Sequence, residues 1–194
     1  MVNFDKINRQ LLTNACLTCQ DPHFQRPTDK MPHVGCCSYS PIFSLFELHK
    51  IVMKDSSFFF HLLNDENSHL NAYDIRVNAW IHPEYTTYQD RSLSKMEKED
   101  VKISYSICRF FEEGTGCTLS PTFKNATCRS FICTTVEDSL DQSHKNQFFS
   151  WVKTIQTEAY SFHKEHREHL ENRKIDLIHN PQAVFDYLKS IEVY

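Results

Sequence analysis

Eight cysteines constrain the fold of this 194-residue chain more than any other feature, because they form two groups far apart in sequence. The groups are Cys16, Cys19, Cys36 and Cys37, then Cys108, Cys117, Cys128 and Cys133. A CxxC pair such as Cys16-x2-Cys19 places two sulfurs within reach of one metal ion, a spacing that recurs in zinc and iron–sulfur sites. The sequence therefore predicts a thiolate-ligated metal centre at which the two groups meet.

The local sequence around the cysteines limits how they can share a metal. Adjacent Cys36 and Cys37 point to opposite sides of an extended backbone, so they can serve one cluster only across a local bend. Gly114 and Gly116 lie between Cys108 and Cys117, where a reversing loop would bring these two thiols together. One centre and two centres both fit this spacing.

At this point the chain resembles a known family. "GCC" followed by an amphipathic helix, and the later "CRFFEEGTGCTLSPTFKNATCRSFIC", are similar to the YkgJ-type cysteine-cluster proteins, which are zinc- or iron-chelating domains. Flagellin lysine N-methylases carry a similar domain. The resemblance covers about Cys16 to Cys133 and implies ligands drawn from all eight cysteines. An insertion over 20–35, and "FKNAT" in place of the family's Arg-Pro step, depart from that pattern.

The sequence leaves the metal open between zinc and an iron–sulfur cluster of the 4Fe-4S kind, because thiolates suit both. Aromatic side chains tend to shield a cluster from solvent, and four phenylalanines lie among the later cysteines. They are Phe110, Phe111, Phe123 and Phe131. Their presence favours the cluster.

Composition excludes several other classes of protein. A net charge of -4 gives no general attraction to nucleic acid, so we expect no nucleic-acid partner. We also expect no membrane association, because no segment has the length and apolarity of a membrane span. The first residues carry no apolar signal region, which indicates a cytoplasmic protein with reduced thiols. With three glycines the chain contains neither GxGxxG nor a P-loop, which argues against those nucleotide sites.

Hydrophobic periodicity predicts an α+β fold, mainly helical with a small antiparallel sheet, organised around the cysteine-ligated metal centre. Helices are expected from Pro41, capped by Ser40, to about residue 52, and over 56–63, 148–162 and from Pro181 onward. Alternating apolar residues predict antiparallel strands over 73–81 and 101–107. We expect a single domain over 1–194, with the helical segment 143–194 packed on it.

Histidine and arginine side chains are secondary candidates. His163, His166 and His169 recur every third residue and could enter an interior metal or acid–base site, but their charged neighbours favour a solvated helix face. His33 could complete a site with three thiolates, although an ordinary loop histidine is the simpler interpretation. Arg129 could stabilise a thiolate or, more simply, pair with a carboxylate.

Two other functions stay open. The resemblance to flagellin N-methylases implies an S-adenosylmethionine-dependent enzyme that acts on a protein substrate. Alternatively, the cysteines serve thiol redox chemistry, or disulfides stabilise a secreted protein.

Overall fold

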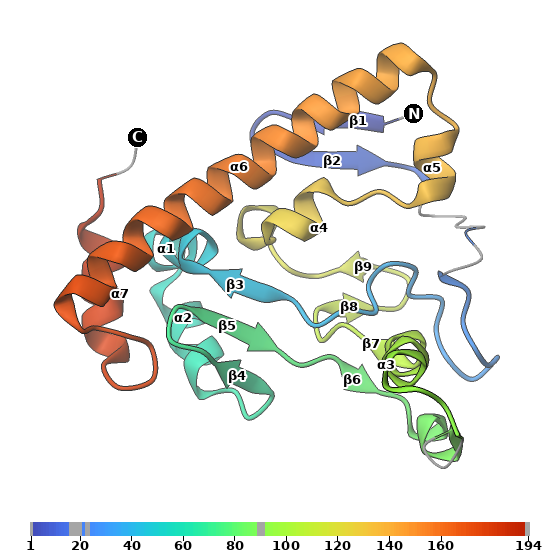
Figure 1. Ribbon diagram of the computed structural model, residues 1–194, viewed down its shortest axis with the longest axis horizontal. Coiled ribbons are helices and arrows are strands. Elements are labelled where there is room, and N and C mark those ends of the chain that lie inside the picture. Colours follow the sequence, from blue (N-terminus) through green and yellow to red (C-terminus); the bar gives the residue numbers. More distant parts are fainter. Residues whose placement is uncertain (1, 16–20, 22–23, 89–91, 193–194) are drawn as a thin grey trace.

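The structure, a computed structural model, describes residues 2–15, 21, 24–88 and 92–192, which form helices and small antiparallel sheets. The predicted α+β class is therefore confirmed, while a metal centre that organises it stays a prediction. In Figure 1 the helix α6 (Gln142–Arg173) runs along one side of the molecule, past the hairpin of β1 and β2 and past α4 and α1.

The N-terminal hairpin consists of β1 (Val2–Asp5) and β2 (Gln10–Thr13), which pair antiparallel. The Asp5 carboxylate accepts hydrogen bonds from the backbone N–H groups of Ile7 at 2.9 Å and Asn8 at 3.2 Å, which fixes the turn. The sequence analysis did not predict this hairpin. Its strands have four residues each, too few for a clear alternation.

The largest of the described sheets has three antiparallel strands, in the order β3 (Ile42–Ser44), β5 (Asp74–Val77), β4 (Ser68–Leu70). Phe43 of β3 lies opposite Ile75 of β5, and both side chains are fully buried. The predicted strand over 73–81 is thus confirmed in two parts, because residues 74–77 form β5 and residues 80–81 form a separate short strand.

The helix α1 (Leu45–Lys54) starts later than predicted. Ser40 does not cap it, and the Ser40 hydroxyl instead accepts a hydrogen bond from the backbone N–H of Ala79 at 2.9 Å, in the segment between β5 and the next strand. The cap is Ser44, whose N–H and hydroxyl both donate to the Glu47 carboxylate, at 3.1 and 2.6 Å. The predicted helix start was wrong because strand pairing with β5 extends the chain before Ser44.

The other predicted helices are present. They are α2 (Ser56–Asn64), α6 and α7 (Pro181–Ser190), and Pro181 occupies the first turn of α7 as expected. Helix α6 extends beyond the predicted range of 148–162 at both ends. It begins at an Asp141 side chain that accepts from the backbone N–H of His144 at 2.9 Å, and it ends at Lys174 in the left-handed conformation.

The predicted strand over 101–107 was wrong in its first part. Most of it belongs to α3 (Lys95–Ser104), and only β7 (Ser106–Ile107) is extended. Ser94 and Glu97 form a capping box that starts α3, and this local signal outweighs the alternation that follows. The predicted antiparallel pairing is nevertheless confirmed, because β7 pairs with β6 (Trp80–Ile81).

Short elements connect the second cysteine group. They are the hairpin of β8 (Phe111–Glu112) and β9 (Gly116–Cys117), the turn η4 (Pro121–Phe123), and the helices α4 (Ala126–Ser130) and α5 (Thr134–Asp138). Gly114 and Gly116 both have positive φ, 81° and 88°, so the predicted reversal between Cys108 and Cys117 exists as this hairpin.

Two hydrophobic clusters support these elements. The larger packs α1, α2 and α7 against the sheet through buried residues such as Leu48, Phe59 and Val184. The smaller packs α5 and α6 under the N-terminal hairpin, and Phe4 of β1 stacks on Trp151 of α6 at 5.3 Å. In the part of the chain that the structure describes, every helix is too short or too polar to cross a bilayer. The single-domain organisation stays a prediction.

Candidate thiol site

The first cysteine pair lies in a turn at Gly35, whose φ of 55° is in the left-handed region. The backbone N–H of Cys37 donates to the carbonyl of Val34 at 3.0 Å, which supplies the local bend that adjacent thiols need in order to face one site. A hydrogen bond from the Cys36 thiol is the main cause that lowers the pKa of Cys37 to about 7, against the opposing effect of burial. The Cys37 thiol therefore loses its proton more readily than an ordinary cysteine thiol.

Cys108 connects the second cysteine group to the first. Its backbone N–H donates to the Cys37 carbonyl oxygen at 2.7 Å, directly after β7 ends. The pKa of the Cys108 thiol is raised to about 11, mainly by burial and in smaller part by the neighbouring Cys37 and Cys117 thiols. Two segments far apart in sequence therefore meet at their cysteines.

Cys117 and Cys128 also lie near Cys37 and Cys108. Cys117 ends β9, and Cys128 lies in α4, where its N–H donates to the Asn125 side chain at 2.8 Å. Although part of Cys128 is exposed to solvent, the protein packed around its thiol raises the pKa to about 12. The thiols of Cys108, Cys117 and Cys37 add to that shift. Four thiols thus lie near enough to influence one another's charge, and we call them the thiol cluster: Cys37, Cys108, Cys117 and Cys128.

The remaining candidate cysteines have different positions. Cys36 lies beside the thiol cluster, hydrogen-bonded to Cys37. Cys133 precedes α5 and packs against the smaller hydrophobic cluster. Cys16 and Cys19 lie outside the residues that the structure describes, so their predicted role stays a prediction.

The thiol cluster fits a thiophilic metal by its donor chemistry, since thiolates are the preferred ligands of zinc and of iron–sulfur clusters. Within the described ranges, however, no group of three or more His, Cys, Asp or Glu side chains is arranged so that it could hold a metal ion. The four thiols therefore influence one another's charge, but their sulfur atoms are not arranged around a single point as metal ligands are. Ligation would then require the thiols to move toward one another.

Lys124 is the cation beside the thiol cluster, and the sequence analysis missed it. It lies between η4 and α4, and its charge lowers the pKa of Cys37 and opposes the rise at Cys128. A lysine before the "NATCR" segment is a weak signal, because a charged loop residue is normally solvated. Only the fold shows that Lys124 lies close enough to Cys37 to act on the charge of its thiol.

Arg129 has the simpler of its two predicted roles. Its guanidinium is 1% exposed and lies 3.7 Å from the Glu47 carboxylate of α1, which is 2% exposed. It also donates to the backbone carbonyls of Lys124 at 3.1 Å and Arg9 at 3.3 Å. These bonds fix α4 against α1 and the N-terminal hairpin, so Arg129 holds the helix that carries Cys128.

The histidines of α6 contact other helices instead of forming a solvated face. His163 Nδ1 accepts from the backbone N–H of Leu45 at 3.4 Å. His166 and His169 are both hydrogen-bonded to the Tyr187 hydroxyl of α7, at 2.7 and 3.2 Å. The favoured surface interpretation was therefore wrong for the first two, while His169 remains exposed. The imidazoles are used to join α6 to α1 and α7.

His33 and the phenylalanines complete the predicted set. His33 is exposed in its loop. Phe110 and Phe123 pack on Phe58 in the larger hydrophobic cluster, with ring centroids 6.2 and 5.6 Å away, and Phe131 is 40% exposed. Phe110 and Phe123 thus contribute to the core, and the aromatic argument for an iron–sulfur cluster over zinc weakens.

Comparison with known proteins gives no neighbour for this arrangement. No protein-family model matches the chain, and neither a curated protein nor a solved structure matches it significantly.

Proposed function

We propose that this chain is a metal-binding protein of the YkgJ-like cysteine-cluster type, which holds zinc or a 4Fe-4S cluster through thiolates. The observation that carries the proposal is the meeting of Cys37 with three thiols of the distant second group, fixed by the hydrogen bond from Cys108 N–H to the Cys37 carbonyl. The resemblance of both cysteine segments to that family supports the same function. A cytoplasmic location, where thiols stay reduced, belongs to this proposal.

The electrostatics of the thiol cluster support a bound cation. Burial and mutual repulsion hold Cys108 and Cys128 in their protonated form at neutral pH, since their pKa values are about 11 and 12. A bound metal ion reverses this balance, because it stabilises thiolates and releases their protons. Lys124 supplies one positive charge beside Cys37 and Cys128. Cys37, Cys108, Cys117 and Cys128 would hold the metal, with Cys16, Cys19 and Cys36 as further donors.

Anaerobic purification followed by a visible spectrum and elemental analysis tests this proposal. A brown protein with stoichiometric iron and sulfide identifies the cluster, and a colourless protein with stoichiometric zinc identifies the other metal. The double variant Cys37→Ser/Cys108→Ser should lose the metal. The control variant Cys133→Ser also removes a thiol, but one that packs against the smaller hydrophobic cluster, and it should keep the metal. A wild-type protein with neither metal, or equal loss from both variants, contradicts the assignment.

Thiol redox chemistry is the second candidate, and one observation favours it. The hydrogen bond from Cys36 lowers the pKa of Cys37 to about 7, so an appreciable part of this thiol is thiolate at neutral pH. Such a thiolate attacks a disulfide such as oxidised glutathione. Intact mass after treatment with oxidised glutathione tests this, because a redox role requires a modification at Cys37 that a reductant reverses. An unchanged mass removes this candidate.

A further inference from the structure

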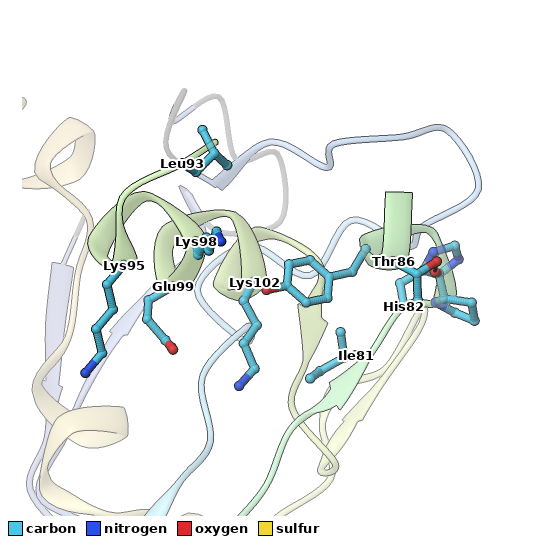
Figure 2. A pocket seen from close by; sticks show the side chains of 10 residues that line it. Ile81, His82, Thr86, Leu93, Lys95, Lys98, Glu99 and Lys102 are labelled. Atoms are coloured by element: carbon cyan, nitrogen blue, oxygen red, sulfur yellow. Dashed lines mark hydrogen bonds between the residues drawn. The ribbon is translucent and has the colours of Figure 1, made fainter. Parts of the chain in front are cut away.

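A cavity of ≈ 760 Å³ lies between α3 and the segment that follows β6, and the proposed metal function does not use it. One wall carries three lysines of α3, namely Lys95, Lys98 and Lys102. Figure 2 shows Lys95, Glu99 and Lys102 extending from the same side of the helix, with Ile81 and His82 beyond Lys102. The volume is within the range of about 300–1,000 Å³ that small-molecule sites occupy.

The three lysines concentrate positive charge in a chain whose net charge is -4. Among the lining residues that the structure describes, Glu99 is the one acidic side chain, so three lysines leave an excess of positive charge there. Across the described part of the chain, none of these three ammonium groups belongs to an ion pair. The ammonium groups are therefore available to a ligand.

The spacing of these lysines works against the stability of α3 itself. Lys98 lies three residues from Lys95 and four from Lys102, so these like charges repel, and Glu99 offsets only part of this because it is one acidic side chain beside three lysines. Lys95 and Lys98 also lie in the first turn, where the helix dipole disfavours positive charge. An anion in the cavity would offset both costs.

His82 adds a hydrogen-bond donor on the opposite wall. Its Nδ1 accepts from the backbone N–H of Glu84 at 3.3 Å, so in the neutral imidazole the proton resides on Nε2. The ring of His82 is also held edge-on to Trp80, with centroids 5.5 Å apart. The lining thus combines an imidazole N–H donor with lysine ammonium groups, a combination suited to phosphate oxygens.

Apolar side chains complete the lining. Ile81, Tyr85 and Leu93 contribute to the same cavity, and the Tyr85 ring is supported by Tyr105 at a centroid distance of 6.2 Å. A tyrosine ring beside aliphatic side chains is a surface on which a planar ring can stack. The cavity therefore combines a cationic side with a surface for a flat apolar group.

We propose that this cavity binds a phosphorylated small molecule with a planar ring, that is, a nucleotide. The phosphates lie against Lys98 and Lys102 with His82 Nε2 as a donor, and the base lies against Tyr85. Recognition here uses side chains, so it needs no glycine-rich loop. This inference is independent of the proposed metal site.

Isothermal titration calorimetry with ATP, tripolyphosphate and adenosine tests this inference. We expect ATP to bind more tightly than either fragment, and its affinity to fall as salt rises. The double variant Lys98→Glu/Lys102→Glu should weaken ATP binding at least tenfold. Lys153→Glu/Lys164→Glu, with the same charge change on exposed positions of α6, should leave it unchanged.

The variants should fold, because no residue of α3 is fully buried, and circular dichroism checks this. No detectable ATP binding by the folded wild type, or equal weakening by both double variants, would overturn the site. Equal affinity for ATP and tripolyphosphate would overturn the role of the ring surface.

Discussion

At the residue scale, the most consequential contact is the buried pair of Arg129 and Glu47. Both side chains are almost fully buried, and Arg129, which lies in α4, also donates to the backbone carbonyls of Lys124 before that helix and of Arg9 in the N-terminal hairpin. Such a pair contributes little net stability when intact, since desolvation opposes its attraction, but removal of one partner leaves a buried charge. The pair therefore fixes the position of α4 more than it stabilises the fold.

Arg129→Met should lower the free energy of unfolding by about 3–5 kcal/mol, because Glu47 is left without its cation. The double variant Arg129→Met/Glu47→Gln should recover part of that loss. Urea unfolding of the three proteins measures both effects. A single variant as stable as the wild type would show that the pair does not matter for α4.

Backbone strain at Gly116 gives a second prediction at this scale. Its φ is 88°, and a Cβ there would meet nothing within 4 Å, so the cost of substitution comes from the backbone alone. Gly116→Ala should lower the free energy of unfolding by about 1–3 kcal/mol and displace Cys117. Gly116→Asn should cost less, because Asn adopts left-handed conformations more readily. Equal stability of the alanine variant and the wild type would contradict this.

At the element scale, imidazoles join α6 to α1 and α7. Burial lowers the pKa of His49, His163 and His166 below the ordinary value of 6.5. His49 also donates from Nδ1 to the Leu188 carbonyl oxygen at 3.0 Å and stacks on Phe162. These helices therefore pack around neutral imidazoles, and their packing should depend on pH.

The sign of that dependence follows from the lowered pKa values. Below about pH 6.5 the histidines bind protons in the unfolded chain but stay neutral in the folded protein. Their contribution to the free energy of unfolding is therefore fully present above that pH and is lost as the pH falls. Urea midpoints at pH 7.5, 6.5 and 5.5 should fall in that order. His49→Gln should flatten the decline. A midpoint that rises as the pH falls would contradict this account.

Element by element, the sequence predicted what depends on local signals. The helices α6 and α7 were predicted because apolar residues recur there at helical spacing, with Pro181 marking the start of α7, and α2 was predicted from its apolar run. The start of α1 and the strand expected at 101–107 failed where strand pairing or a capping box outweighed a short pattern. Partners distant in sequence were not predictable, which is why Lys124 and the Glu47 partner of Arg129 were found only in the fold.

At the scale of the whole molecule, the thiol cluster links the segment at Cys37 to the chain from Cys108 to Cys128. The prediction that the two groups share one metal rested on spacing and resemblance and stays a prediction, while the hydrogen bond from Cys108 N–H to the Cys37 carbonyl joins the two segments. If a metal holds them, ligation free energy is part of the folding free energy. Metal removal should then loosen the contacts between these segments.

Chelation should therefore lower the thermal midpoint by roughly 4–16 °C, because we expect a loss of about 2–4 kcal/mol and each kcal/mol shifts the midpoint of a domain of this size by about 2–4 °C. Calorimetry before and after treatment with a strong chelator measures this, and readdition of the metal should restore the midpoint. An unchanged midpoint after proven metal loss would contradict a structural role for the ion.

X-ray absorption at the metal edge of the purified protein tests the central claim most directly, because it reports the atoms bound to the metal. We predict a first shell made mainly of sulfur, at about 2.3 Å, that is lost in the Cys37→Ser/Cys108→Ser variant. A first shell of oxygen and nitrogen only, or a sulfur shell unchanged in that variant, would contradict the claim that the two cysteine groups hold one metal.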